Sequence, residues 1–263
     1  TDFLSPFFAS SSHLNRVRTH ITKRVLPFAT SIRVVSNRIK DALLQHKGYK
    51  LKTTPVVLPI FTDMKKIQTT DPSFDLKVKY PQWSFIILVV ARLSPEKNVT
   101  DALAVLKVLL KKYTKMGMVI VGSGPLRKSL KFKVKSLKLE DNVVFKGQQE
   151  DTISYYKTAH LFLQTSLYEG FGLALLEAVT ARCPSVSTDV GIASEFLQYP
   201  NQQFVCPVGD VLCLAGAISR FVENNQLRQL FSLDIAPTIV EPFYQTKESY
   251  LNAYRASFEE GGM

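Results

Sequence analysis

Short, mostly apolar segments alternate with helix-like segments between residues 85 and 223, and this alternation limits the fold more than any other feature. The strand-like segments cover residues 85–90, 118–121, 143–145, 161–163 and 185–188. The helix-like segments cover residues 99–113, 126–139, 152–158, 172–182 and 210–223. Strands that alternate with helices form repeated β–α units, and strands this apolar are buried on both faces. The pattern predicts an α/β fold with a Rossmann-like parallel sheet covered by helices on both faces.

The first third of the chain is less regular. Its expected elements are a basic helix over residues 15–23, a strand over 31–36, a helix capped by Ser36 or Asn37 that runs through His46, and a strand over 56–58. Residues 62–82 are polar, contain two prolines and show no clear period, so they are the linker candidate. The predicted parts are an N-terminal segment (1–70), a ligand-binding Rossmann-like domain (71–242) and a C-terminal crossing helix with its tail (243–263).

The three cysteines form no CxxC pair and are odd in number. We therefore expect Cys183, Cys206 and Cys213 to be free thiols in a reducing compartment. No zinc-type cluster of Cys and His appears, so no metal site is predicted. The sequence shows no signal peptide and no apolar run as long as a membrane span. The expected location is the cytoplasm.

The formal net charge of +11 is unevenly distributed. Residues 1–60 contain ten Lys and Arg against Asp2 and Asp41, and Lys107 to Lys138 contains another ten with no acid. A solvated basic face and an anionic membrane surface explain this bias equally well, because a basic residue gains ~1 kcal/mol near anionic lipids. Nucleic acid is not a predicted partner, because no helix-turn-helix, zinc-finger or RNP-type motif accompanies the charge. A peripheral position at the inner face of the membrane is therefore one expectation.

Three loops that follow predicted strands should meet at one edge of the sheet, where parallel sheets bind ligands. In the first loop, Arg92 and Lys97 flank a proline turn. The planar fork of arginine and the point charge of lysine suit a diphosphate. A solvated loop in which Arg92 pairs with Glu96 is the alternative, and the loop taken alone favours it.

The second loop has the sequence Gly-Ser-Gly-Pro over residues 122–125. Gly122 and Gly124 permit the backbone to approach a ligand closely, although such a pattern is usually just a tight turn. The third glycine and the acidic ribose ligand of a dinucleotide fingerprint are missing from their places. This absence argues against a dehydrogenase.

The third loop, Glu-Gly-Phe-Gly-Leu over residues 169–173, leads into a helical segment that contains Glu177. Free backbone N–H groups at the start of a helix favour phosphate, and a carboxylate on each side suggests a ligand that also has hydroxyls, such as a sugar nucleotide. The rival interpretation is the acid and nucleophile of a glycosidase. We reject it, because an eight-residue helical offset of ~12 Å is too long for either class.

Taken in order, these motifs resemble the donor-binding half of the retaining glycosyltransferases of family 4, which have the GT-B fold. The resemblance covers residue 31 to the C-terminus. It rests on Arg92 and Lys97, Gly122–Pro125, Val144–Gly147, Ser166–Leu173, Glu177–Ala178, Asp189–Gly191 and Glu195. The E-x7-E pair is moderately specific alone, and it is a strong signature when it follows the Arg/Lys loop in this order.

The resemblance implies a hexosyltransferase that moves a sugar, with retention, from a UDP- or GDP-linked donor to a glycan or lipid-linked acceptor. It implies no metal and no further cofactor, and the chain contains no Asp-x-Asp motif. The implied catalytic residues are Arg92 and Lys97, which neutralise the diphosphate, and Glu169, which contacts the sugar hydroxyls. Glu177 would accept hydrogen bonds from the ribose. The other implied donor-binding residues are Gly122, Gly124, Phe145, Gly170, Phe171, Gly172 and Leu173.

The sequence also departs from the family pattern. Family members have two Rossmann-like domains, the first of which binds the acceptor, and here only the end of that domain is expected. The chain is therefore expected to be a fragment or a truncated protein. A non-catalytic nucleotide-sugar binding module and a GT-B-fold sugar-nucleotide epimerase remain alternatives. The closing helix over residues 244–258 should cross back to the first domain, so its apolar residues Tyr250, Leu251 and Tyr254 are expected to lack a partner.

Overall fold

The computed structural model describes residues 6–10, 12–48, 50–197 and 204–259. The chain divides into two compact units. Unit 1 comprises residues 1–63, 168–171 and 243–263, and unit 2 comprises residues 64–167 and 172–242. The C-terminal segment therefore belongs with the first sixty-three residues. Among the described residues, no helix is both long enough and apolar enough to span a membrane.

Unit 2 contains a six-stranded sheet in which every pair is parallel, with the order β5-β4-β3-β6-β7-β8. The strands are β3 (Phe85–Val90), β4 (Met116–Val121), β5 (Val143–Gly147), β6 (Leu161–Gln164), β7 (Ser185–Thr188) and β8 (Val205–Cys206). All but the last of these match the segments predicted from apolar composition. The predicted α/β fold with a Rossmann-like parallel sheet is confirmed.

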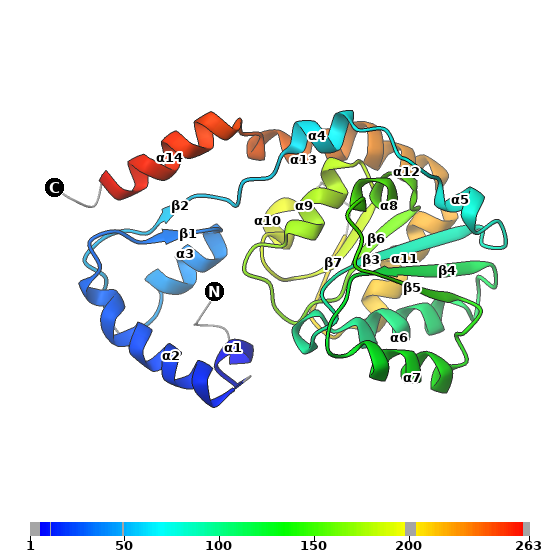
Figure 1. The fold of residues 1–263 in the computed structure, drawn as a ribbon, viewed down its shortest axis with the longest axis horizontal. Coiled ribbons are helices and arrows are strands. Elements are labelled where there is room, and N and C mark those ends of the chain that lie inside the picture. Colours follow the sequence, from blue (N-terminus) through cyan, green and yellow to red (C-terminus); the bar gives the residue numbers. More distant parts are fainter. Residues whose placement is uncertain (1–5, 11, 49, 198–203, 260–263) are drawn as a thin grey trace. The chain divides into compact units, whose positions relative to one another are not determined.

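Helices cover both faces of this sheet (Figure 1). One face carries α6 (Val99–Leu109), α7 (Arg127–Leu137) and α11 (Val211–Glu223), and the other carries α8 (Thr152–Thr158), α9 (Leu173–Thr180) and α13 (Ala236–Val240). Shorter elements are α4 (Met64–Thr69), α5 (Leu76–Lys79), the 3₁₀ turn η2 (Pro95–Lys97), α10 (Ala193–Phe196), α12 (Asn225–Leu230) and the π-helical η3 (Phe231–Ile235). Strand β3 is central and nearly inaccessible, with Ile86, Ile87 and Leu88 at 0% exposure, because helices pack on both of its faces.

The boundary between the two units falls between Asp63 and Met64, inside the expected linker over residues 62–82, but the rest of that range is not a linker. This stretch forms α4 and α5 and buries Met64, Ile67 and Leu76 within unit 2. The Asp75 side chain accepts from the Lys77 N–H at 2.8 Å and caps α5. The buried residues are too few and too far apart to show a period, so the sequence pattern does not predict these helices.

The N-terminal part of unit 1 is built around a parallel pair of two-residue strands, in which Arg33 lies opposite Val56. Its elements are α1 (Pro6–Ser10), α2 (His13–Val25), η1 (Leu26–Phe28), β1 (Arg33–Val34), α3 (Asn37–Leu44) and β2 (Val56–Val57). Ser36 caps α3 as predicted, since its hydroxyl accepts from the Ile39 N–H at 3.4 Å. Ile32, Val34 and Leu43 form a small core beneath this helix.

The C-terminal helix α14 (Lys247–Glu259) has partners in unit 1, so the expectation that its aromatic residues lack one is wrong. The Arg33 guanidinium lies 4.5 Å from the centre of the Tyr254 ring, and the Tyr250 ring lies 5.5 Å from that of Phe61. The Ser31 hydroxyl donates to the Ser257 carbonyl at 2.6 Å. Leu251 alone among the three named residues is exposed. The short turn η4 (Glu241–Phe243) precedes this helix.

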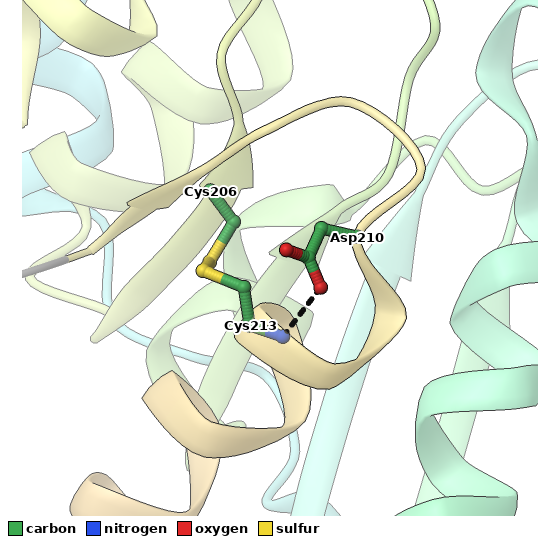
Figure 2. The surroundings of a disulfide bond; sticks show 3 residues. All are labelled: Cys206, Asp210 and Cys213. Carbon is green, nitrogen blue, oxygen red and sulfur yellow. Dashed lines mark hydrogen bonds between the residues drawn. A yellow bond between two sulfur atoms is a disulfide. The ribbon is translucent and has the colours of Figure 1, made fainter.

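Cys206 and Cys213 form a disulfide, which corrects the expectation of three free thiols (Figure 2). Cys206 ends β8 and Cys213 lies in the first turn of α11, and this turn brings their Cα atoms to 5.8 Å. Asp210 caps the helix by accepting from the Cys213 N–H at 2.9 Å (Figure 2). Only Cys183 remains a thiol, and it is buried. The cysteines therefore give no support to a reducing compartment.

Candidate functional site

The order of strands in unit 2 reverses between β3 and β6. These strands are hydrogen-bonded neighbours, with Ile87 opposite Leu161, and the chain winds outward from them in both directions. Loops that follow two such strands diverge to opposite faces of the sheet and leave room for a ligand at its carboxyl edge. The loop after β3 and the loop after β6 therefore start from the expected binding position.

The loop after β3 presents both predicted cations. Arg92 is exposed and Lys97 is half-buried at the end of η2, while Leu93 between them is fully buried and anchors the loop. The alternative in which Arg92 pairs with Glu96 is not observed. The Glu96 carboxylate instead accepts from the Ser94 hydroxyl at 2.5 Å.

Hydrogen bonds to backbone carbonyls tie this loop to the segment that follows β6. The Leu167 N–H donates to the Glu96 carbonyl at 2.8 Å, and the Thr165 hydroxyl donates to the Asn98 carbonyl at 3.0 Å. Thr165 also reaches the Lys97 carbonyl at 3.3 Å. The turn that carries Lys97 is thus fixed by the neighbouring loop.

The glycines of the loop after β4 serve the packing of two loops. A Cβ on Gly124 would lie 2.4 Å from the Leu93 carbonyl oxygen, and one on Gly122 would lie 2.0 Å from that of Ala91. Gly122 also has a φ of +128°, which strongly favours glycine. The Leu93 N–H donates to the Ser123 carbonyl at 2.9 Å, which holds the two loops together. Gly122 and Gly124 therefore allow the loop after β4 to pack closely on the loop that carries Arg92. This packing explains why both residues are glycine, without the approach of a ligand.

Gly172 is the N-cap residue of helix α9, and it has a φ of +105° and provides no side-chain cap. A Cβ there would meet nothing closer than 3.9 Å, so the backbone conformation, not space, requires glycine. Leu173 is the first helical residue and is 39% exposed. Because no side chain caps the helix, its first N–H groups remain available to an anion.

Glu177 lies one turn into α9 and is half-buried. Burial raises its carboxyl pKa, and a 3.1 Å hydrogen bond from the Tyr156 hydroxyl lowers it. Tyr156 belongs to α8 and is itself fully buried, which raises the pKa of its phenol well above the usual range. Tyr156 is not among the residues predicted from sequence. The sequence did contain a signal for it, because two adjacent tyrosines on a seven-residue helix cannot both face solvent on the same side, and one of them is expected to face the core.

Phe145 is half-buried near the carboxyl end of β5. The chain turns at Gly147, which has a φ of +72° and whose carbonyl accepts from the Gly122 N–H at 2.7 Å. Glu169, Gly170 and Phe171 lie on the segment 168–171, which groups with unit 1. The geometry of unit 2 brings the other eight predicted residues to the carboxyl edge of one sheet.

Sequence comparison places the chain in a family. The model of the family "Glycosyl transferases group 1" matches residues 75–232. The chain belongs to this family. The match spans most of unit 2 and includes every residue of the predicted site.

Curated relatives of this group 1 glycosyltransferase chain are longer than the chain itself. N-acetyl-alpha-D-glucosaminyl L-malate synthase from Bacillus anthracis is 30% identical over 130 residues, which cover 49% of this chain and 34% of that protein. Poly(glycerol-phosphate) alpha-glucosyltransferase from Bacillus subtilis is 28% identical over 166 residues, which cover 62% of this chain and 25% of that protein. The similarity thus spans about a quarter to a third of the length of these relatives.

Solved structures share the fold. Sucrose-phosphate synthase from Thermosynechococcus elongatus matches with a TM-score of 0.80 and 22% identity, over 98% of this chain and 65% of that one. HepE from Anabaena, in complex with UDP-glucose, matches with a TM-score of 0.78 and 23% identity, over 98% of this chain and 69% of that one. The fold is that of the GT-B glycosyltransferases.

Proposed function

We propose that this chain binds the nucleoside-diphosphate sugar of a retaining, metal-independent hexosyltransferase. The observation that carries the proposal is the reversal of strand order between β3 and β6. There the Arg92 and Lys97 loop is tied by hydrogen bonds to the segment that leads into α9. Cations, free helix N–H groups and a carboxylate from Glu177 then surround one binding position.

The cations suit the leaving group of the reaction. Breaking the bond between the anomeric carbon and the diphosphate leaves negative charge on the diphosphate oxygens. Arg92 and Lys97 stabilise that charge, and they do so without a metal ion. Loss of one such donor costs about 3 kcal/mol of transition-state stabilisation, which corresponds to roughly a 100-fold slower reaction.

Each of the remaining residues binds a different part of the donor. Glu177 accepts hydrogen bonds from the ribose hydroxyls, and the N–H groups from Gly172 and Leu173 hold phosphate oxygens. Phe145 faces the base. For Glu169, Gly170 and Phe171, which group with unit 1, contact with the transferred sugar is a prediction that rests on the family resemblance alone.

The relatives suggest which donor to test first. HepE was crystallised with UDP-glucose, and two relatives are named as glucosyl and N-acetylglucosaminyl enzymes. We therefore propose a UDP-linked hexose, with GDP as the second choice, and a glycan or a lipid-linked acceptor. A peripheral position at the inner face of a membrane accompanies this proposal as a prediction, because anionic lipids attract a chain with a formal net charge of +11.

Calorimetry with UDP and GDP in the presence of EDTA tests donor binding. Lys97→Gln and Glu177→Gln should each weaken the binding of UDP about tenfold or more, because each removes one polar contact with the ligand. Lys107→Gln removes an equivalent exposed charge from α6 and should change nothing. The proposal fails if neither nucleotide binds, or if binding requires added Mg²⁺.

Turnover separates an enzyme from a binding module. A non-catalytic module that binds a nucleotide sugar is the second candidate function. An enzyme releases UDP from UDP-glucose or UDP-N-acetylglucosamine in the presence of a glycan or lipid acceptor, and Lys97→Gln slows that release roughly 100-fold. A module binds UDP with the same dependence on Lys97 and Glu177 and releases none.

A further inference from the structure

Helix α7 turns a basic face away from the sheet. It buries Leu130 and Val134 and packs beside α6 (Figure 1). Lys128, Lys131 and Lys135 lie three and four residues apart and therefore share one exposed side of the helix. We call these three lysines, together with Phe132 among them, the α7 patch.

Among the described residues, no acidic side chain pairs with the lysines of the α7 patch. No acid lies in the first turn of the helix, so Lys128 is near the positive end of the helix dipole, where a cation is unfavourable. Lys131 and Lys135 are like charges one turn apart and repel each other. None of the three side chains forms a hydrogen bond or ion pair within the part of the chain that the structure describes. An anionic partner would relieve this repulsion.

Phe132 narrows the choice of partner. Its side chain is 74% exposed, and it is the one aromatic residue of the helix. Nucleic acid binding by stacking uses successive aromatic rings along a groove, which this helix does not offer. A lipid surface accommodates both features, because lysines contact anionic headgroups while an aromatic side chain enters the acyl boundary.

We propose that the α7 patch docks unit 2 onto an anionic lipid surface, with Lys128, Lys131 and Lys135 on the headgroups and Phe132 inserted. This proposal depends on the proposed function only for the location at a membrane, and it does not depend on the binding of a nucleotide sugar. Helix α2 also exposes apolar residues, among them Leu14 and Ile21. It lies outside the residues that match the family, whereas α7 and its neighbours lie wholly within them.

Sedimentation with vesicles tests this surface. The full chain is mixed with vesicles of phosphatidylcholine alone or of phosphatidylcholine with phosphatidylglycerol. Each lysine near an anionic surface changes partitioning about fivefold, so the Lys128→Gln/Lys131→Gln/Lys135→Gln variant should bind roughly 100-fold more weakly. Phe132→Ser should lose about tenfold, and this loss should persist at high salt because it is not electrostatic.

Two control variants are matched to these changes. Lys47→Gln/Lys50→Gln/Lys65→Gln removes the same number of exposed charges elsewhere, and Leu233→Ser removes an equally prominent apolar side chain, 64% exposed, from another part of unit 2. Both should bind the anionic vesicles nearly as the wild type does. Near-ultraviolet circular dichroism checks that every variant is folded, and UDP calorimetry on the α7 variants keeps this test separate from the proposed function.

Several results would overturn the proposal. One is equal binding to both kinds of vesicle or to neither. Another is an equal loss in the charge-matched control, which would show an effect of net charge alone. A third is a loss in Ile21→Ser with full binding in the α7 variants, which would assign the contact to α2. Binding to a single-stranded oligonucleotide that depends on Phe132, without vesicle binding, would assign the patch to nucleic acid.

Discussion

The Tyr156 hydroxyl donates a 3.1 Å hydrogen bond to Glu177 and joins α8 to α9 beneath the candidate site. Tyr156 is 1% exposed, so its ring is held by the core and its hydroxyl has a fixed position. Burial raises the pKa of Glu177, and this bond opposes that rise. Tyr156 therefore orients the carboxylate and favours its ionised form, and it acts through Glu177 as a positioning residue.

Tyr156→Phe should weaken UDP binding about tenfold, because it removes the donor that orients Glu177. The substitution should also raise the pKa of Glu177 further. As the pH is lowered, the variant should therefore begin to lose affinity for UDP at a higher pH than the wild type does. Calorimetry across a series of pH values measures both effects. Tyr155→Phe is the matched control, since the Tyr155 hydroxyl binds Gln149 at 3.2 Å instead. An unchanged affinity and pH profile in Tyr156→Phe would remove the positioning role.

Gly124→Ala should lower the free energy of unfolding by about 2 kcal/mol, because the new methyl group collides with rigid backbone at Leu93. Gly216→Ala is the control within unit 2. It lies inside α11, where a Cβ meets nothing within 4 Å, so it should stabilise the protein by about 0.5 to 1 kcal/mol through helix propensity. Urea denaturation measures both variants. A neutral Gly124→Ala would mean that the two loops separate easily.

Reduction of the disulfide should lower the free energy of unfolding by about 2.5 kcal/mol, because Cys206 and Cys213, seven residues apart, no longer restrict the unfolded chain. Denaturation with and without a phosphine reductant measures this. The Cys206→Ser/Cys213→Ser variant should not respond to the reductant. Burial raises the pKa of the remaining Cys183 thiol to about 12, so it should resist alkylation until the protein unfolds. Rapid alkylation of native wild type at Cys206 would contradict the disulfide.

Acidification from pH 6.5 to pH 4 should destabilise unit 2 by about 2 kcal/mol through His160. Burial, with the nearby charges of Lys77 and Arg228, lowers the pKa of this histidine to about 4, while the unfolded chain titrates near 6.5. The unfolded state therefore binds more protons in this window, and stability falls as the pH falls. His160 Nδ1 also accepts from the Ile86 N–H at 3.0 Å, which requires an unprotonated nitrogen.

His160→Asn retains an acceptor for that bond and cannot become charged at this position. Its stability, measured by denaturation at each pH, should vary less across the window than that of the wild type. The difference between the two curves isolates the histidine from the carboxyl groups that titrate at lower pH. Parallel curves would show that His160 does not contribute.

Local pattern alone determined strands β3 to β7 of unit 2 and the helices α6 to α9 that alternate with them. The bounds of β3, α8 and β7 are those predicted, because a doubly buried strand and a capped helix leave their signature within a few residues of sequence. The order of Arg92, Lys97, Glu169 and Glu177 along the chain also points to a sugar nucleotide, because cations suit its diphosphate and carboxylates suit its hydroxyls. Each of these features depends on residues that are close in sequence or on their order along the chain, so it can be recognised from the sequence.

The tertiary structure decided which residues of different segments come into contact. It paired Cys206 with Cys213 through the two-residue strand β8, which is too short to show a period. It brought Tyr156 to Glu177, and it explained Gly124 by the backbone of Leu93. Each of these contacts depends on the order of strands in the sheet and on the packing of helices above it. That order results from burial summed over the whole unit, so no single stretch of sequence reports it.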